Sequence, residues 1–306
     1  MELIALNNQL RGMIYGFIVG DALGVPVEFK ARGTFEVSDM IGYGTYNLPT
    51  GTWSDDSSLL LCTIEHMNEK STLDDLMQKF ADFDFRNYMT PFGETFDIGI
   101  TTHEACQNFE YLKRSAIDCG LSGEYDNGNG SLMRIIPIVK MTLDFPVEDK
   151  YRVISDYSKL THGHERSIMG YMIYILVVET LLGNVDKSEL LNHVQIQLEE
   201  LGNDYSAYYR IFNGLENLHV DEIKSTGYVV DTLEAVLYCY LNHETYQEGI
   251  FAAINLGNDT DTIGALTGAL FGATSVYVTE IDNFKSRLAN LEKIESIVEW
   301  YCDNDR

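Results

Sequence analysis

The chain has 306 residues, of which 45% are hydrophobic, and its 21 Lys and Arg against 47 Asp and Glu give a formal net charge of −26. This negative surplus argues against a nucleic-acid binder, which needs a basic face to release counterions, and against docking on anionic lipid. The hydrophobic fraction indicates a sizeable core. Because no break in composition divides the chain, we expect one all-α domain over residues 1–306.

The five cysteines are scattered, odd in number and without a CxxC pair. This usage is typical of reduced thiols in the cytosol, so we expect a cytoplasmic protein without disulfides or zinc. The first residues lack a basic segment followed by a long apolar one, so we expect no signal peptide. The longest apolar run, Ile168–Leu182, is shorter than the ~20 residues of a membrane span and contains Gly170 and Glu179.

Apolar residues recur at spacings of three and four along most of the chain, which predicts a largely helical protein. The segment Thr262–Val278 is rich in Ala, Gly and Leu, as expected of a helix that is packed closely on all sides. The predicted helices, in chain order, are Leu6–Ala22, Ser57–Asn68, Thr72–Phe83, Ile100–Cys119, Leu132–Leu143, Val147–Thr161, Ser167–Leu182, Lys187–Glu200, Tyr205–Asn217, Val229–Asn242, Thr245–Leu256, Thr262–Val278 and Asp282–Tyr301.

Two acidic clusters, Ser54–Asp56 and Asp259–Thr262, each place two carboxylates and at least one hydroxyl at the start of a predicted helix. If the fold brings them together, like charges about 4 Å apart cost on the order of 4 kcal/mol at an effective dielectric near 20, so protons or cations must be present. Oxygen-only ligands favour Mg²⁺ or Mn²⁺ over zinc. The alternative is structural, because Ser and Asp are preferred N-caps and Asp complements the helix dipole.

Four glycine-containing turns carry the other candidate chemistry: residues 20–28, 95–99, 127–134 and 161–164. The third, with the sequence NGNGSLMR, offers unhindered backbone amides at a helix start, which suits a phosphate. Each turn taken singly also has a structural explanation, such as a C-cap glycine, an N-cap Asp or a tight turn.

Taken in order, these segments resemble the ADP-ribosylglycohydrolase family, of the kind that includes the dinitrogenase-reductase-activating glycohydrolases. The resemblance extends from Gly12 to Gly272 and rests on seven motifs: GDALGVPVEF, GTWSDDSSL, FDIGITT, GNGSLMRIIP, THGHERS, GYVVDTLEAVL and NLGNDTDTIGALTGALFGA. It implies a compact orthogonal all-helical bundle with a cleft that binds two Mg²⁺ or Mn²⁺ ions. The family often has Thr where this chain has Ser54, and the hydroxyl oxygen is retained.

The resemblance also implies roles for individual residues. Glu28 matches an acid that reaches over the ribose of the substrate, and with Asp97 it is a candidate catalytic acid. The implied metal ligands are Ser54, Asp55, Asp56, Asp259, Asp261 and Thr262, and the implied substrate-binding residues are Asn129, Gly130, Ser131, His162 and Tyr228.

Asp97 is the clue to the leaving group, because a similar DIG segment marks arginine-directed members and a carboxylate pairs bidentately with a guanidinium. Its alternative role is to cap the helix from Ile100. We therefore expect a metal-dependent hydrolase that releases ADP-ribose from a modified protein side chain, with arginine as the leading acceptor. Serine-linked, acetyl-linked or small-molecule conjugates, a non-catalytic ADP-ribose-binding protein and a structural protein on this scaffold are the alternatives.

Overall fold

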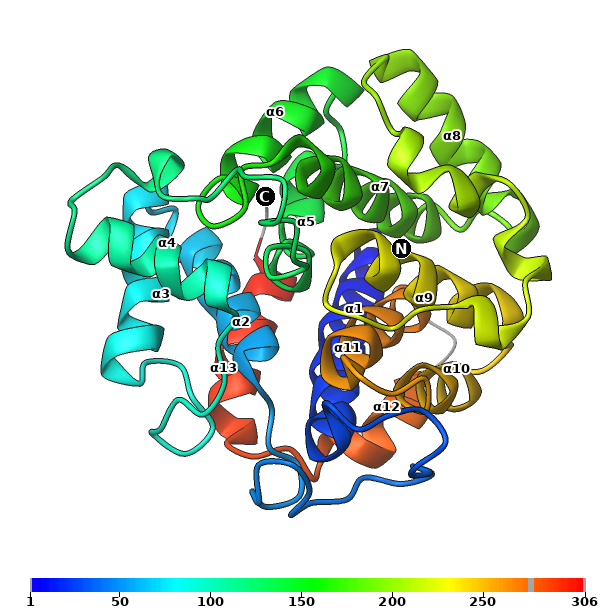
Figure 1. The fold of residues 1–306 in the computed structure, drawn as a ribbon, viewed down its shortest axis with the longest axis horizontal. Coiled ribbons are helices and arrows are strands. Elements are labelled where there is room, and N and C mark those ends of the chain that lie inside the picture. The colour runs from blue at the N-terminus through cyan, green and yellow to red at the C-terminus, as the bar shows by residue number, and fades with distance from the viewer. Residues whose placement is uncertain (1, 275–277, 305–306) are drawn as a thin grey trace.

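The computed structural model is all-α, as predicted, and describes residues 2–274 and 278–304 (Figure 1). Within those ranges the chain forms no β-strand, only isolated bridges between Leu121 and His162 and between Gly128 and Tyr228. The α-helices are α1 Glu2–Gly24, α2 Asp55–Glu69, α3 Leu73–Arg86, α4 Ile100–Glu110, α5 Ile138–Thr142, α6 Val147–Ser158, α7 Glu165–Leu182, α8 Leu190–Leu201, α9 Val229–Asn242, α10 Tyr246–Ile254, α11 Thr260–Gly272, α12 Val278–Lys285 and α13 Leu291–Asp303. The 3₁₀-helices are η1 Val25–Val27, η2 Ala116–Asp118, η3 Leu132–Arg134, η4 Lys187–Glu189, η5 Ser206–Phe212, η6 Leu215–Asn217 and η7 Val220–Glu222.

Several predicted helices are shorter or broken in the structure, and the backbone shows why. The predicted helix over residues 100–119 ends at Glu110, and Lys113 beyond it has a left-handed φ of 55°. The helix predicted over residues 132–143 splits into η3 and α5 around Pro137, which has no N–H to donate. The helix predicted over residues 205–217 is two 3₁₀ segments separated by Gly214, with φ 85°.

The C-terminal helices also differ from the prediction. The helix predicted over residues 262–278 begins earlier, at Thr260, and ends at Gly272, and its expected residues 275–277 lie outside the described residues. The helix predicted over residues 282–301 is two helices, α12 and α13, and Asn290 between them has a left-handed φ of 52°. In contrast, α9 has the predicted bounds.

The centre of the molecule is the contact between α1 and α11, which lie side by side (Figure 1). Glycines at four-residue spacing line the α1 face, and glycines at the same spacing face them from α11. A Cβ on Gly16 would lie 2.3 Å from the carbonyl oxygen of Gly268, and one on Gly20 would lie 2.2 Å from that of Gly264. Side chains other than hydrogen would force the helices apart. This contact fixes the ends of α1 and α11 relative to each other.

Both central helices are buried where they meet, α11 throughout and α1 from Gly12 to Gly24. Every residue of α11 is buried, which confirms the expectation of a helix packed on all sides. The segment Ile4–Val27, longer than the run noted from sequence, is long and apolar enough to cross a membrane by composition, but 94% of its most apolar 18-residue window is buried inside the structure. Its apolar character is therefore accounted for by the protein core.

Candidate functional site

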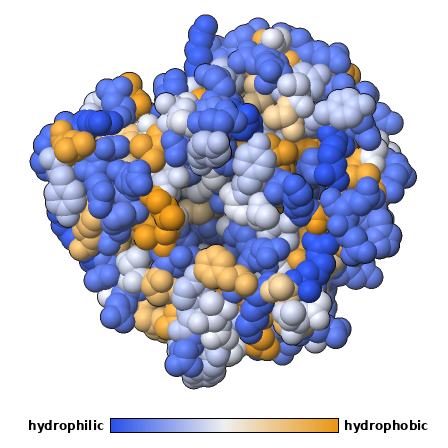
Figure 2. All heavy atoms as spheres, in the orientation of Figure 1, coloured by the Kyte–Doolittle hydropathy of each residue, from blue (hydrophilic) through white to orange (hydrophobic). Residues whose placement is uncertain are grey.

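The two acidic clusters converge, although about two hundred residues separate them in the sequence. Asp55 and Asp56 lie in the first turn of α2, and Asp261 and Thr262 lie in the first turn of α11. The hydroxyl of Thr262 donates to Oδ1 of Asp56 at 3.3 Å, which joins the clusters directly. Figure 2 shows that the surface is hollowed between α2 and α11, with hydrophobic side chains on the rim.

Ser54 shows that the structural and the functional explanations of its cluster are compatible. It is the N-cap of α2, and its side-chain oxygen accepts from the amide of Asp56 at 3.2 Å. A hydroxyl oxygen has a second lone pair, so this cap leaves an acceptor position for a cation. At the other cluster, Asp259 occupies the N-cap position of α11 without a side-chain capping bond.

Asp21, near the end of α1, positions the start of α2. Its buried carboxylate accepts hydrogen bonds from the amide of Ser54 at 3.0 Å and from the amide and hydroxyl of Ser57 at 3.1 and 2.5 Å. This carboxylate ties α1 to the turn that carries Asp55 and Asp56. Sequence reasoning assigned it no role, because within a helical pattern an isolated Asp gives no signal of a partner 33 residues away.

Glu28 follows η1 and is held beside the second cluster by a pair of backbone hydrogen bonds. The amide of Phe29 donates to the carbonyl of Asn258 at 2.7 Å, and the amide of Asn258 donates to that of Lys30 at 2.8 Å. Phe29 and Asn258 both have left-handed φ angles, 62° and 60°. Strained backbone of this kind is characteristic of sites where function fixes the geometry. Here it turns the acid toward α11.

Tyr46 is a site residue that the sequence did not reveal. It lies in the irregular segment between η1 and α2, and its hydroxyl donates to Oε2 of Glu28 at 2.7 Å. Its ring packs edge-on against Phe96, with ring centroids 4.9 Å apart. Tyr46 therefore links Glu28 to the segment that carries Asp97.

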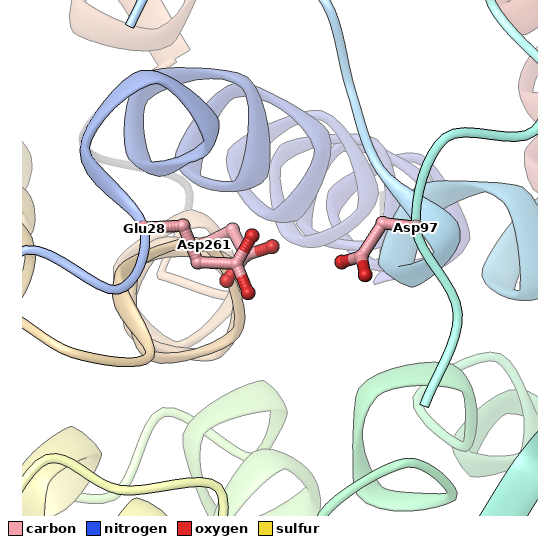
Figure 3. A group of neighbouring side chains, drawn as sticks. All are labelled: Glu28, Asp97 and Asp261. Carbon is pink, nitrogen blue, oxygen red and sulfur yellow. The ribbon is translucent and has the colours of Figure 1, made fainter. Parts of the chain in front are cut away.

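Asp97 faces Glu28 and Asp261 across the site, as Figure 3 shows. Each of the three offers a carboxylate oxygen, and these oxygens lie within 4.8 Å of one another. The alternative role for Asp97, capping the helix from Ile100, is wrong. The N-cap residue of α4 is Gly99, and α4 has no side-chain capping hydrogen bond. Asp97 is thus brought into the site by the fold rather than used to start a helix.

Burial raises the pKa of six carboxylates at the site. The pKa of Glu28 is raised to about 9, first by burial and then by the charge of Asp97, against the hydrogen bond from Tyr46. The pKa of Asp259 is raised to about 6 by burial. The pKa values of a further group are raised above their usual range by burial first: those of Asp55, Asp56, Asp97 and Asp261.

This environment fits a cation. Two unit charges 4.8 Å apart repel by about 3.5 kcal/mol at an effective dielectric of 20. Among the described residues, Oδ2 of Asp56 is buried without a hydrogen-bond partner, and Asp55 accepts only a 3.4 Å bond from the amide of Gly99. The available ligand atoms are all oxygen, which suits a hard divalent ion. A buried acidic cluster with an unpartnered oxygen is what such an ion would neutralise.

The GNG turn lies beside the acidic group and is partly committed to holding it. The side-chain amide of Asn129 donates to Oδ2 of Asp259 at 2.6 Å and to Thr232 at 2.9 Å. Its backbone amide donates to the carbonyl of Gly227 at 3.0 Å. The backbone N–H of Asn129 is therefore already bonded within the protein, and a substrate-binding role for Asn129 stays a prediction. Its side chain orients Asp259.

Gly130 and His162 form the wall of this turn. A Cβ on Gly130 would lie 2.8 Å from Cε1 of His162 and 3.0 Å from Oγ1 of Thr102, so glycine is needed for packing as well as for any ligand. The pKa of His162 is lowered to about 3 by burial and the charge of Arg134, so the ring is neutral. Ser131, also predicted to touch substrate, is buried and donates to the hydroxyl of Ser158 at 3.2 Å.

Tyr228 lies on the other side of the turn. It precedes α9, is half-buried and pairs with Gly128 in an isolated bridge. With Tyr125 and Arg166 it lines a cavity of about 440 Å³. The fold therefore gathers the acids, the GNG turn, His162 and Tyr228 around one hollow face.

A family model described as ADP-ribosylglycohydrolase matches residues 3–304, nearly the whole chain. The chain belongs to this family. It is therefore a glycohydrolase that acts on ADP-ribose conjugates.

Individual members of the ADP-ribosylglycohydrolase family align over most of the chain. The ADP-ribosylarginine hydrolase Tri1 of Serratia proteamaculans is 29% identical over 303 residues, which cover 95% of this chain and 78% of the relative. The ADP-ribosyl-[dinitrogen reductase] glycohydrolase of Rhodospirillum rubrum is 28% identical and covers 88% of this chain and 86% of its own length. A solved ADP-ribosylglycohydrolase-related protein complex superposes with a TM-score of 0.82 at 26% identity, covering 98% of both chains.

Proposed function

We propose that the chain hydrolyses the N-glycosidic bond between ADP-ribose and the arginine side chain of a modified protein, with divalent cations bound at the acidic clusters. ADP-ribose is one product and the restored arginine is the other. The relatives named for arginine-linked or dinitrogen-reductase-linked ADP-ribose, at 28% and 29% identity, support this choice of substrate. Relatives named ADP-ribosylhydrolase ARH3, including that of Mus musculus, are less similar, at 22% identity.

The observation that carries the proposal is the place of Asp97. Its carboxylate is half-buried, faces Glu28 and Asp261 across the site, and is not used as a helix cap. A carboxylate in this position can receive a guanidinium through two charge-assisted N–H···O bonds. A serine or acetyl acceptor offers no such donor pair, so the residue favours the arginine conjugate.

Six residues are proposed to hold the cations through oxygen atoms: Ser54, Asp55, Asp56, Asp259, Asp261 and Thr262. Two observations support this set: Oδ2 of Asp56 has no hydrogen-bond partner among the residues that the structure describes, and Oδ1 of Asp56 accepts from Thr262. Two Mg²⁺ or Mn²⁺ ions fit the oxygen chemistry. When bound, such ions supply a water of lowered pKa and neutralise the carboxylates.

The reaction adds the oxygen of water to C1″ of the distal ribose, breaks the C1″–N bond and returns a proton to the leaving guanidine nitrogen. Glu28 and Asp97 are the acids that can hold this proton, and the hydroxyl of Tyr46 fixes one oxygen of Glu28 at 2.7 Å. Gly130 and His162 line the place proposed for the phosphorylated part of the ligand. Tyr228 is proposed to lie by the adenosine.

The experiment is a substrate panel. The purified chain is incubated with arginine-, serine- and acetyl-linked ADP-ribose, with Mg²⁺, with Mn²⁺ and with a chelator. The proposal predicts that arginine-linked substrate is hydrolysed fastest and only when a cation is present. Faster release of ADP-ribose from the serine or acetyl conjugate would show that arginine is not the preferred acceptor. Binding of a conjugate without hydrolysis would support a non-catalytic ADP-ribose-binding protein.

Asp55→Asn is the matched variant for this panel, with Asp118→Asn as the control on an exposed 3₁₀-helix far from α2 in sequence. Asp55→Asn is expected to raise the concentration of Mn²⁺ needed for activity on every substrate. Asp118→Asn is expected to behave as the unmodified chain. Equal cation requirements in the two variants would remove Asp55 from the ligand set.

A further inference from the structure

Arg134 is a fully buried cation without a carboxylate partner in the described part of the chain. Its Nη2 donates to the carbonyl of Tyr157 at 3.2 Å and to the hydroxyl of Thr161 at 2.8 Å, and its guanidinium stacks on the ring of Phe80. Its Nε and Nη1 have no partner among the described residues. Burying a charge with so few bonds is costly. Because this burial costs stability, we expect a function of Arg134 at the two hydrogen bonds that it makes.

The bond to Thr161 continues to His162. Oγ1 of Thr161 lies 2.9 Å from Nδ1 of His162 and 2.8 Å from Nη2 of Arg134. Because a guanidinium has donors and no acceptor, the hydroxyl oxygen must accept from Arg134. Within the described residues, the acceptor left for the hydroxyl proton is Nδ1 of His162. Nδ1 then has no proton, and in a neutral ring the proton resides on Nε2.

Nε2 is on the side of the ring that faces the GNG turn. It lies 3.3 Å from the place of a Cβ on Gly128 and 3.4 Å from that of a Cβ on Gly130. It has no hydrogen-bond partner in the protein within the described residues. The His162 backbone is fixed separately, since its amide donates to the carbonyl of Ser158 at 2.8 Å. The ring thus presents one N–H donor at the turn.

We propose that Arg134 and Thr161 are positioning residues that fix His162 as the Nε2–H tautomer, which donates a hydrogen bond to an oxygen of bound ADP-ribose. The oxygen belongs to the diphosphate or to a hydroxyl of the distal ribose, which share the chemistry of an acceptor. The lowered pKa of His162 agrees with a neutral donor, because the buried charge of Arg134 opposes a second one. This inference rests on the proposed function for its ligand.

The test compares two substitutions at Thr161. Thr161→Val keeps the shape but removes the hydroxyl, and Thr161→Ser keeps the hydroxyl. Thr142→Val is the matched control, because this buried threonine in α5 donates only within its own helix, to the carbonyls of Ile138 and Val139. All three variants are first checked for an unchanged circular dichroism spectrum.

The first readout is the nitrogen resonances of His162 in ¹⁵N NMR, which a merely structural role of Thr161 would not move. The unmodified chain, Thr161→Ser and Thr142→Val are expected to show a pyridine-like Nδ1 and a pyrrole-like Nε2. Thr161→Val is expected to show a mixture or the reverse. A pyrrole-like Nδ1 in the unmodified chain, or an unchanged spectrum in Thr161→Val, would overturn the proposal.

The second readout is the Kd of ADP-ribose by calorimetry. Loss of one oriented donor predicts about tenfold weaker binding for Thr161→Val and a change within about twofold for Thr161→Ser. The Kd of ADP for the same two variants distinguishes the two candidate acceptor oxygens. If Thr161→Val also binds ADP more weakly, the acceptor is a phosphate oxygen. If only the affinity for ADP-ribose falls, the acceptor is a hydroxyl of the distal ribose. If Thr161→Val binds ADP-ribose and ADP with the same Kd values as the unmodified chain, the proposal is contradicted. These readouts do not depend on which conjugate is cleaved, so they can fail separately from the proposed function.

Discussion

Removing divalent cations is expected to make the stability of the folded chain fall as the pH rises. Burial and Asp97 raise the pKa of Glu28 to about 9, against an ordinary value of 4.5. Between these values the folded chain holds a proton that the unfolded chain releases. The stabilisation is therefore complete below pH 4.5 and is lost as the pH rises through 9. At about 1.4 kcal/mol for each pH unit, the loss from Glu28 reaches about 6 kcal/mol.

The assay is thermal unfolding from pH 5 to pH 9 in excess chelator and in excess Mn²⁺. Between pH 5 and pH 9 the loss is about 5 kcal/mol, which predicts a fall in Tm of roughly 10 °C across this range in chelator. Bound cations favour the ionised carboxylates, so the curve in Mn²⁺ is expected to be much flatter. Glu28→Gln removes the titrating group and is expected to reduce the slope in chelator, whereas Glu36→Gln, an exposed acid of the same segment, leaves it unchanged. Coincident curves in chelator and Mn²⁺ would refute the reasoning.

Two further substitutions test the packing and the acid. Gly20→Ala places a Cβ 2.2 Å from the carbonyl oxygen of Gly264. We therefore expect urea unfolding to show a free energy of unfolding lower by at least about 1–3 kcal/mol. Stability equal to that of the unmodified chain would contradict the close contact between α1 and α11. Tyr46→Phe removes the hydrogen bond that the Tyr46 hydroxyl donates to Glu28. We expect kcat to fall about tenfold with little change in KM. An unchanged kcat would show that Glu28 does not need this hydrogen bond.

Much of the site was predictable because its acids lie at helix starts with recognisable residue patterns. Asp55, Asp56, Asp259 and Asp261 were expected to share a site, and the bond between Asp56 and Thr262 confirms that their clusters meet. The family and the all-α fold are confirmed as well. The roles of individual residues, the single-domain organisation, the cytoplasmic location and the absence of nucleic-acid and membrane partners remain predictions.

The parts that the sequence did not reveal depend on contacts between distant segments. Tyr46 lies in an irregular segment without periodicity, and its partner Glu28 is identified only by the folded structure. Asp21 lies inside a helical pattern, so its bond to Ser54 left no local signal. The glycines of α1 and α11 did leave a signal, their repeated spacing of four, which predicts close helix contact once it is noticed.

The most direct test of the central claim is the rate at which Asp97→Asn hydrolyses ADP-ribosyl-arginine in saturating Mn²⁺, measured beside its affinity for free ADP-ribose. The substitution keeps the size of the side chain and removes the charge that faces the guanidinium. At about 1.5–3 kcal/mol for each charge-assisted bond, the account predicts a fall of roughly 10- to 100-fold or more in hydrolysis with nearly unchanged ADP-ribose binding. Full activity in this variant, or a parallel loss of ADP-ribose binding, would contradict an arginine-directed role for Asp97.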